Sequence, residues 1–389
     1  MILKEQGIII VGAGAAGLSA AAVLRTEGYD GPLWVVNGEQ HRPYNRTLIN
    51  KALLGGLITP EQITQPAAHT LEADLMQSMV VSADTRRRTA TLSDGRELTY
   101  GALLAATGSA PRRSPLVPDA SERILQLHTI DDAVRLRDKL GKDPDKKTVT
   151  VVGAGFIGAE AASFLTDCGA SVQLVSRPIV PMRFALGLQI AQRVAELHHA
   201  HVDTHFGQDV LSIEEGPVSV DTTLSGGQVL ESDLVVVAVG TVPDSAWLTG
   251  DTGGLAVDPH LRAIQHQHVY AAGSIAFHHT ANGRSYRIDH WDDAVAQGAH
   301  AARTLLYDFD GASDPGPYAP DTGFMTSLYR QAIAAYGTVL PGSKERPQDV
   351  DASDSLLTTF HLAGEAITAV AAVNAFPQLL SVRNQITAP

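Results

Sequence analysis

The sequence is poor in cysteine, in positive charge and in long apolar runs. Cys168 is the single cysteine among 389 residues, which excludes an intramolecular disulfide framework and makes a reducing cytoplasm the simplest compartment. The formal net charge of -13 argues against a general nucleic-acid or anionic-membrane binder, because both need a positive surface field. No apolar run approaches the roughly 18 residues of a membrane-spanning helix. The first expected strand begins near Gly7, so we expect no targeting segment before it.

The length and the order of elements predict several domains. At roughly 100 to 200 residues per domain, the chain should hold two or three, and its apolar content of 44% predicts packed interiors. A continuous apolar strand at 7–11 leads to a glycine-rich loop, a helix of strong helix formers that ends at Gly28, and a strand at 33–36. The same order returns with a strand at 148–152, a second glycine-rich loop, a helix through about Asp167 and a strand at 172–175. The chain thus repeats one βαβ unit at long range.

The two glycine-rich loops have the G-x-G-x-x-G pattern of dinucleotide-binding turns. They read Gly12-Ala13-Gly14-Ala15-Ala16-Gly17 and Gly153-Ala154-Gly155-Phe156-Ile157-Gly158. The glycines permit a tight turn, a close approach to a pyrophosphate and close packing of helix on strand, while the helix N-terminus supplies unpaired N–H groups. A tight turn without a ligand can have the same pattern, but both copies here lie between a strand and a helix. We therefore predict two dinucleotide sites.

The remaining segments complete the predicted architecture. Buried strands at 103–106, 234–239 and 269–272 each end in a glycine turn, and a helix from Asp289 has an apolar stripe of 3.6-residue spacing. The last segments, within 324–340 and 355–373, alternate like antiparallel strands before a closing helix near 377–386. We predict an α/β fold with two Rossmann-like dinucleotide-binding domains and a C-terminal α+β domain. The expected boundaries are 1–113 with 244–318, then 114–243, then 319–389.

The residues about 20 positions after each loop indicate which ribose is bound. After the first loop this position is Asn37, and Glu39 is the better placed partner for the adenosine ribose, the alternative being a solvated turn carboxylate. After the second loop the strand ends in Ser176-Arg177, with no carboxylate. A carboxylate favours a free 2'-hydroxyl, whereas an arginine favours a 2'-phosphate. The sequence therefore predicts NADPH rather than NADH.

Several motifs carry a resemblance to a known family. With both loops, Ala106-Thr107-Gly108 and the Gly-x-x-Pro at 240–243 resemble the glutathione-reductase superfamily of two-dinucleotide flavoproteins. The segment 42–51, RPYNRTLINK, resembles the ferredoxin reductases that serve oxygenases and cytochromes P450. The segments 106–112, 155–160 and 290–298 are similar to further motifs of that group. The resemblance covers about residues 6–307 well and the remainder poorly.

The resemblance implies FAD on the first loop and the nicotinamide coenzyme on the second. It also implies that Lys51 lies beside the flavin and pairs with Glu160 near the nicotinamide. Without the resemblance, the two residues would be taken for plain surface charges. An ammonium there favours the negative charge of reduced flavin, and a carboxylate partner makes its burial tolerable. The other cofactor-binding residues that the motifs imply are Arg46, Ala106, Thr107, Gly108, Arg112, Gly240, Gly273, Ser274, His290 and Trp291.

The chain departs from that family at two places. Family members have an aspartate after the late short strand, where it holds a ribityl hydroxyl, but Gly273 is followed here by Ser274. Because a serine lacks the charge-assisted strength of a carboxylate, we expect weaker or altered FAD contacts. The tryptophan that the family places over the flavin is also missing. Phe324 or Tyr329 either covers part of the ring or belongs to the core.

The single cysteine bears on the electron acceptor. Cys168 lies near a helix end, so we interpret it as a buried small hydrophobe, and without a thiol relay electrons must leave the flavin directly. The resemblance implies a ferredoxin-type iron–sulfur protein as acceptor. The alternatives are an NAD(P)H oxidase or quinone reductase, and a slow-turnover redox-sensing flavoprotein.

Two clusters of side chains have a plain interpretation. His198, His199, His201 and His205 straddle a helix end and a strand without a matching carboxylate or thiolate cluster, so no metal site is predicted. The segment 86–88, three consecutive arginines, is most simply a solvated loop. It is alternatively a docking patch for an acidic ferredoxin.

Overall fold

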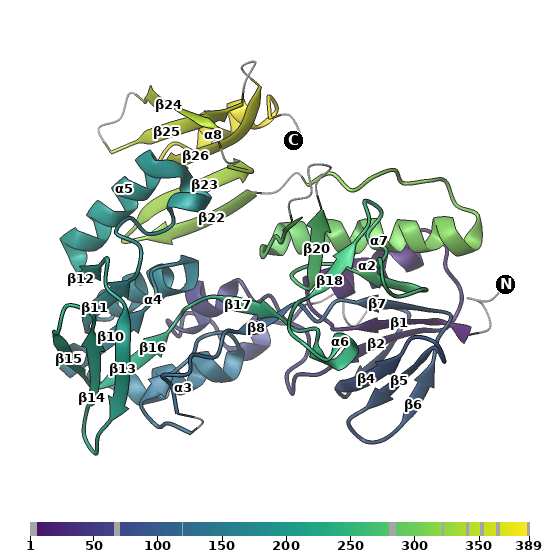
Figure 1. The fold of residues 1–389 in the computed structure, drawn as a ribbon, viewed down its shortest axis with the longest axis horizontal. Helices are drawn as coiled ribbons and strands as arrows, with labels where there is room; N and C mark the ends of the chain where they lie inside the picture. The colour runs from purple at the N-terminus through teal and green to yellow at the C-terminus, as the bar shows by residue number, and fades with distance from the viewer. Residues whose placement is uncertain are drawn as a thin grey trace. The chain divides into compact units, whose positions relative to one another are not determined.

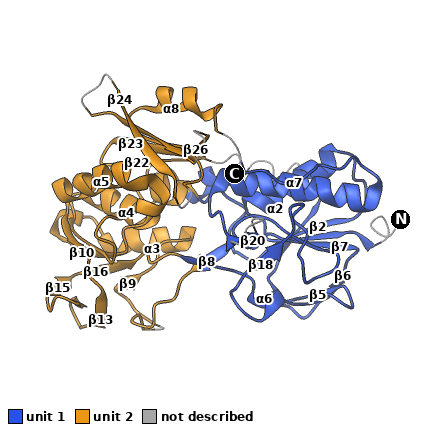
Figure 2. Ribbon diagram, turned by 45° about the horizontal axis from the view of Figure 1, so that its top comes forward, with its two compact units in different colours: residues 1–46, 60–110, 241–320 blue, residues 47–59, 111–240, 321–389 orange. Residues whose placement is uncertain are grey.

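The chain forms two compact units, each of which contains one glycine loop. The computed structural model describes residues 6–65, 71–118, 120–279, 285–320, 323–339, 342–350, 354–362 and 366–386. Unit 1 comprises 1–46, 60–110 and 241–320, and unit 2 comprises 47–59, 111–240 and 321–389 (Figure 2). The predicted boundaries at 113 and 244 lie near residues 110 and 240, after which the chain passes from one unit to the other. The division into three domains stays a prediction.

Unit 1 is built on a parallel sheet of five strands in the order β19-β7-β1-β2-β3. Their bounds are Ile8–Val11 for β1, Leu33–Asn37 for β2, Asp74–Gln77 for β3, Ala102–Ala105 for β7 and Val269–Ala271 for β19. β1 and β7 are buried along their whole length, as continuous apolar runs in a parallel sheet should be. Helices α2 (Ala15–Thr26) and α7 (Trp291–Asp310) lie together along one side of this sheet (Figure 1). A Cβ at Gly298 would lie 2.1 Å from the Ala16 carbonyl oxygen, so glycine is what allows the two helices to approach.

Smaller elements complete unit 1. An antiparallel sheet joins β4 (Val80–Asp84), β5 (Thr89–Leu92) and β6 (Glu97–Thr99), and another sheet joins β18 (Leu255–Val257), β20 (Ala276–His279) and β21 (Ser285–Tyr286). β8 (Ser109–Pro111) pairs with β17 (Thr241–Pro243) where the chain twice crosses between the units. The short helical turns are η2 (Pro60–Ile63) and α6 (Ala246–Thr249).

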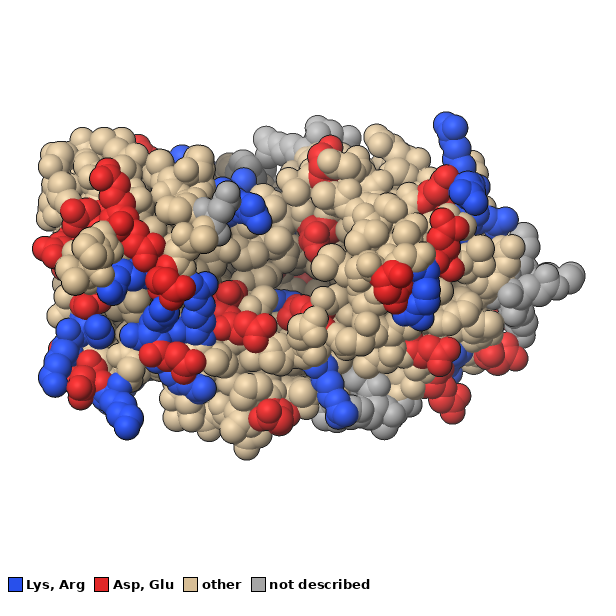
Figure 3. Space-filling view, turned by 90° about the horizontal axis from the view of Figure 1, so that it is seen from below, with Lys and Arg blue, Asp and Glu red and all other residues tan. Residues whose placement is uncertain are grey.

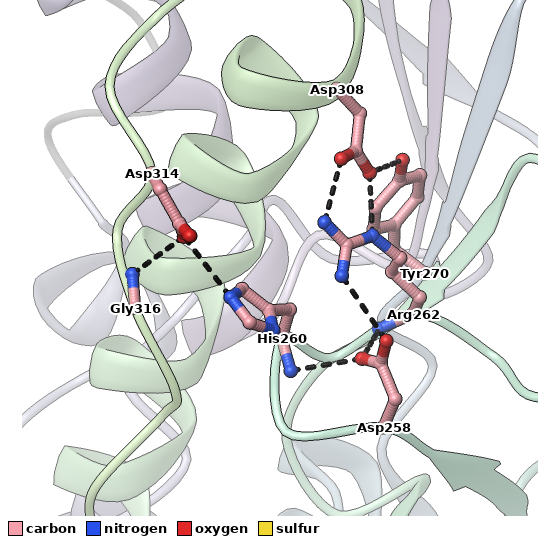
Figure 4. Close-up of polar contacts among 7 residues, drawn as sticks. All are labelled: Asp258, His260, Arg262, Tyr270, Asp308, Asp314 and Gly316. Atoms are coloured by element: carbon pink, nitrogen blue, oxygen red, sulfur yellow. Dashed lines mark hydrogen bonds and ion pairs between the residues drawn. The ribbon is translucent and has the colours of Figure 1, made fainter.

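A polar network fastens the end of α7 to the strands of unit 1 (Figure 4). Arg262 donates two hydrogen bonds to Asp308, of 2.7 and 2.6 Å, and a third of 3.1 Å to Asp258. The hydroxyl of Tyr270 on β19 donates to Asp308 at 2.6 Å. The hydrogen bond to Asp308 raises the pKa of Arg262, and burial raises that of Tyr270. A fork-shaped, charge-assisted pair of this kind stabilises unit 1.

Unit 2 has a second parallel sheet, in the order β12-β11-β10-β16-β9. The strands are β9 (Ile124–Leu125), β10 (Thr148–Val152), β11 (Ser171–Ser176), β12 (Asp203–Phe206) and β16 (Leu234–Val237). Helices α3 (Ile130–Leu140), α4 (Phe156–Asp167) and α5 (Arg183–His201) accompany it. The other elements are the turns η1 (Ile49–Leu53) and η4 (Pro144–Lys146), and the antiparallel sheet of β13 (Val210–Glu215), β14 (Val220–Leu224) and β15 (Val229–Ser232).

The end of the chain adds an antiparallel sheet to unit 2, in the order β22-β23-β26-β25-β24. The strands are β22 (Gly323–Leu328), β23 (Gln331–Gly337), β24 (Lys344–Asp349), β25 (Leu356–His361) and β26 (Ile367–Val373), followed by α8 (Phe376–Arg383). Because alternate residues face opposite sides, Ile333 packs in the cluster with α5 and Ala334 in the cluster with α8. The predicted fold class, with its antiparallel C-terminal sheet and closing helix, is confirmed. Across the described ranges, no helix combines the length and apolar character that a membrane crossing needs.

Candidate functional site

The outer glycines of both loops are required by backbone packing. Gly12 and Gly153 have φ of +108° and +104°, and a Cβ on either would lie 2.3 Å from a carbonyl oxygen of the neighbouring strand's end. A Cβ on Gly17 would lie 1.9 Å from the Gly12 oxygen, and one on Gly158 would lie 1.8 Å from the Gly153 oxygen. Real Cβ atoms do not approach backbone oxygens so closely. The two loops therefore share one tightly packed backbone.

The middle glycines, in contrast, face open space. Gly14 and Gly155 are the N-cap residues of α2 and α4, with ordinary φ values of -82° and -78°. A Cβ on either would meet no described atom within 4 Å, and neither helix has a side-chain cap in the described part of the chain or an acidic residue in its first turn. Unpaired N–H groups at a helix start, beside an open position, suit a diphosphate. The loops thus fit one dinucleotide in each unit.

Three predicted segments of unit 1 come together at the carboxyl edge of its sheet. Residues 12–17 follow β1, 106–108 follow β7 and 273–274 follow β19, and these three strands are neighbours and parallel. A Cβ on Gly273 would lie 3.2 Å from the Cβ of Ala16. His290 is the N-cap of α7 and Trp291 its first residue. Ligands of parallel α/β sheets bind outside this edge, where the strand order reverses.

The residues expected at the adenosine ribose form a hydrogen-bonded group. Asn37 is buried and donates to the His41 carbonyl at 2.8 Å. The carboxylate of Glu39 accepts a 2.6 Å hydrogen bond from the Tyr44 hydroxyl and pairs with Arg46, whose guanidinium lies over the Tyr44 ring. Glu39 is thus a positioned carboxylate at the end of β2 rather than a loose turn residue.

Lys51 and Glu160 come together within unit 2. Lys51 Nζ lies 3.9 Å from Glu160 Oε1 and donates to the Met325 carbonyl at 2.8 Å. The Glu160 side chain is 11% exposed and also accepts from Asn50 Nδ2 at 3.2 Å and from Thr326 Oγ1 at 2.5 Å. The pair forms because the segment 47–59 belongs to unit 2 although it is preceded and followed by unit 1. Asn50 and Thr326 are not among the predicted residues.

The end of β11 differs from the end of β2. The Ser176 side chain is buried and donates to the Pro178 carbonyl at 3.1 Å, so it shapes the turn. The Arg177 side chain is 83% exposed and lies 4.0 Å from the exposed carboxylate of Asp209. An exposed pair at this distance contributes little, so the guanidinium is available to a ligand. Gly240 follows β16 with φ of +94°, and its carbonyl accepts from the backbone N–H of Arg112 at 2.9 Å.

The two aromatic candidates of the C-terminal sheet have different surroundings. Phe324 on β22 packs edge-to-face on Phe156, the first residue of α4, with ring centroids 4.5 Å apart. Tyr329 is buried, its hydroxyl lies 2.8 Å from His198 Nδ1, and His201 stacks on its ring. Burial lowers the pKa of His198 to about 4. Tyr329 thus belongs to the core, whereas Phe324 lies beside the second loop.

His199 and His205 have local partners, and Cys168 lies at the far end of α4 from the second loop. His199 lies 2.5 Å from Thr204 Oγ1 and His205 lies 3.1 Å from Asp203, and no group of three side chains able to hold a metal occurs among the described residues. Cys168 caps the C-terminal end of α4, and burial raises its thiol pKa. Cys168 is the C-cap and Gly155 the N-cap of α4, so the two are about 20 Å apart along the helix.

The three arginines at 86–88 lie in the β4–β5 turn. The backbone N–H groups of Arg86 and Arg87 donate to Asp84 Oδ1 at 2.9 and 3.0 Å, which is a side-chain-closed turn. Figure 3 shows one face of the molecule, on which basic and acidic side chains of the described residues are interspersed.

Two parallel α/β units, each with an open glycine loop at the carboxyl edge, define the class of two-dinucleotide oxidoreductases. The chain belongs to the pyridine nucleotide-disulphide oxidoreductase family, whose family model matches residues 6–298. It is a flavoprotein NAD(P)H oxidoreductase that resembles ferredoxin reductases, and the family implies FAD and NAD(P)H as cofactors.

Relatives with known names agree with this class. The chain is 26% identical to the ferredoxin–NAD(+) reductase component of the 3-phenylpropionate/cinnamic acid dioxygenase of Photorhabdus laumondii, covering all of this chain and 98% of the relative. It is 30% identical to human apoptosis-inducing factor 3, covering 96% of this chain but only 62% of that relative's length.

Among solved structures, the ferredoxin reductase of the CYP199A2 system from Rhodopseudomonas palustris matches with a TM-score of 0.87 and 26% identity, covering 98% of this chain and 95% of that one. Putidaredoxin reductase, in its covalent complex with putidaredoxin, matches with a TM-score of 0.84 and 24% identity, covering 97% of this chain and 92% of that one. At that identity the second match supports the fold.

Proposed function

We propose that this chain passes electrons from NADPH through FAD to a ferredoxin-type iron–sulfur protein that serves an oxygenase or a cytochrome P450. The observation that carries the proposal is the combination of two open glycine loops with a single cysteine at the far end of α4. A disulfide reductase needs a thiol relay, which one distant and half-buried cysteine does not provide. Electrons therefore leave to an external acceptor. The names of the dioxygenase and P450 reductases that the chain resembles support the same acceptor.

In this proposal the protein supplies position and charge, while FAD when bound supplies the change from two-electron to one-electron transfer. The first loop and the residues at the carboxyl edge of unit 1 hold FAD, and the second loop holds the coenzyme. Lys51 provides a positive charge that favours reduced flavin, and Glu160 keeps it paired. Asn50 and Thr326 fix the Glu160 carboxylate through their hydrogen bonds. If Lys51→Ala leaves the rate of flavin reduction unchanged, the assigned role is wrong.

The preference for NADPH follows from the end of β11. A buried serine and an exposed arginine stand where a carboxylate would select the free 2'-hydroxyl of NADH. The similar dioxygenase components are named as NAD(+) reductases, so NADH is the competing coenzyme. The ratio of kcat/KM for the two coenzymes decides between them, and a clear preference for NADH would refute this part of the proposal.

Steady-state reduction of cytochrome c, with and without an added [2Fe–2S] ferredoxin, tests the acceptor. We expect the ferredoxin to raise the rate, because a small iron–sulfur protein takes electrons singly from flavin. Equal rates would instead indicate an oxidase or a quinone reductase. Flavin reduction too slow to sustain turnover would indicate a redox sensor.

A further inference from the structure

Asp289 lies at the carboxyl edge of the unit 1 sheet, although no motif pointed to it. Its carboxylate accepts hydrogen bonds from the Ser274 hydroxyl and from Thr241 Oγ1, the latter at 2.6 Å. Ser109 Oγ lies 3.4 Å from the carboxylate, and Arg287 Nη2 lies 3.5 Å from it. Ser109 follows β7 and Ser274 follows β19, so Asp289 stands between the ends of two neighbouring strands.

The carboxylate is held in place but remains accessible. The Asp289 side chain is 38% exposed despite its partners, whereas that of Arg287 is 17% exposed. Burial alone would raise the pKa of Asp289, but the hydroxyls of Ser274 and Thr241 and the charge of Arg287 hold it below its usual value. The group is therefore an ionised acceptor with a fixed orientation.

The sheet order indicates which half of a dinucleotide reaches Asp289. The strand β1 and its phosphate loop lie between β2 on one side and β7 with β19 on the other. Glu39, the carboxylate suited to the adenosine ribose, stands after β2. A dinucleotide whose diphosphate rests on the loop after β1 must then extend its other half toward β7 and β19. In FAD that half begins with the ribityl chain, which carries several hydroxyl groups.

We propose that Asp289 is a cofactor-binding residue of unit 1, and that its carboxylate accepts hydrogen bonds from ribityl hydroxyls of FAD. Ser274 and Thr241 orient the carboxylate for this contact. A ribityl hydroxyl that donates to a carboxylate forms a stronger hydrogen bond than one that donates to a neutral serine. Asp289 is therefore a better acceptor for such a hydroxyl than Ser274. The proposal rests on the proposed function, because it requires FAD in unit 1.

The test uses the full-length apoprotein and two ligands. FAD binding is followed by quenching of flavin fluorescence, and ADP, which shares the diphosphate and adenosine but lacks the ribityl chain, is measured separately by calorimetry. Asp289→Asn removes the charge with little change in shape, and Asp289→Glu keeps it. Asp292→Asn is the matched control, because it removes one carboxylate charge from an exposed residue in the first turn of α7.

We expect Asp289→Asn to weaken FAD binding by about 10-fold or more, as the loss of a hydrogen bond to a charged group implies. Its ADP affinity should stay that of the wild type, while Asp289→Glu retains most of the FAD affinity and Asp292→Asn retains all of it. Unchanged FAD binding in Asp289→Asn, or equal losses of FAD and ADP, would overturn the inference. A wild-type apoprotein that binds ADP but no FAD would instead overturn the proposed function.

Discussion

The two glycine loops have the same backbone but different neighbours. In both, the outer glycines are packed against carbonyl oxygens and the middle glycine is open. After the first loop, the next strand leads to Glu39, which Tyr44 and Arg46 hold. After the second, the next strand ends at a buried serine and an exposed arginine. The shared loop suits the phosphates that both dinucleotides carry, and we expect the strand end beside it to select the rest of the nucleotide.

The largest expected effect separates the packed glycines from the open ones. Gly158→Ala should lower the free energy of unfolding of unit 2 by about 3 kcal/mol or more, because its Cβ would overlap a backbone oxygen that cannot move away. Gly155→Ala, three residues earlier, should lower the same free energy of unfolding by no more than about 1 kcal/mol. Chemical denaturation measures both. Equal losses for the two variants would mean that the loop is not packed as described.

Acid should destabilise unit 2 through one buried histidine. Burial lowers the pKa of His198 to about 4, so the stability that its neutral form provides is complete above pH 6.5, and about 3 kcal/mol of it is lost as the pH falls to 4. In unit 1, burial lowers the pKa of several histidines, among them His278, and raises that of Asp293 to about 6, so protonation there has opposing effects on stability.

Hydrogen exchange measured from pH 7 to pH 4 tests the contribution of His198. Amides in the core of unit 2 should lose protection as the pH falls, and His198→Gln should reduce that loss. A loss of protection in unit 2 that His198→Gln leaves unchanged would contradict the assignment of this titration.

A methyl group in the open position of each loop should affect one ligand only. Gly14→Ala places a Cβ where we propose that the FAD diphosphate binds, and should weaken FAD binding about 10-fold. Gly155→Ala should raise the KM for the coenzyme by a similar factor with normal flavin content. Flavin content after gel filtration and steady-state kinetics measure the two effects. If Gly155→Ala depleted flavin instead, the assignment of the loops would be reversed.

The smallest expected effect concerns the choice of coenzyme. Arg177→Ala should lower kcat/KM for NADPH by about 5- to 10-fold and leave that for NADH nearly unchanged, because only the 2'-phosphate offers a charge to the guanidinium. The ratio of kcat/KM for NADPH to kcat/KM for NADH should therefore fall toward one. Arg183→Ala, also exposed and at the start of α5, provides the comparison variant. A parallel fall for both coenzymes would mean that Arg177 acts on a feature they share.

The sequence was sufficient for the features that repeat with a regular spacing. The two βαβ units, the helix after Asp289 and the antiparallel C-terminal sheet all follow from patterns of apolar residues and glycine. The surroundings of Glu160 could not be predicted in the same way. Its partners Asn50 and Thr326 come from an early turn and a late strand, which only tertiary packing brings to α4.

The sequence did not identify Asp289 as a site residue for a similar reason. It lies in the segment before α7, and the partners that mark it as a held carboxylate come from turns up to 180 residues away. The sequence shows at Ser274 only a serine where the family has an aspartate. The structure places a carboxylate directly beside its hydroxyl, which a single sequence does not reveal.

We propose that the first loop holds a flavin and the second a reduced coenzyme that delivers electrons to it. Anaerobic stopped-flow mixing of the purified protein with NADPH tests this most directly. We expect the absorbance of bound flavin to bleach at a rate that saturates with NADPH concentration, and Gly155→Ala to raise the NADPH concentration needed for saturation without removing the flavin. A purified protein that holds no flavin, or a flavin that NADPH does not bleach, would contradict it.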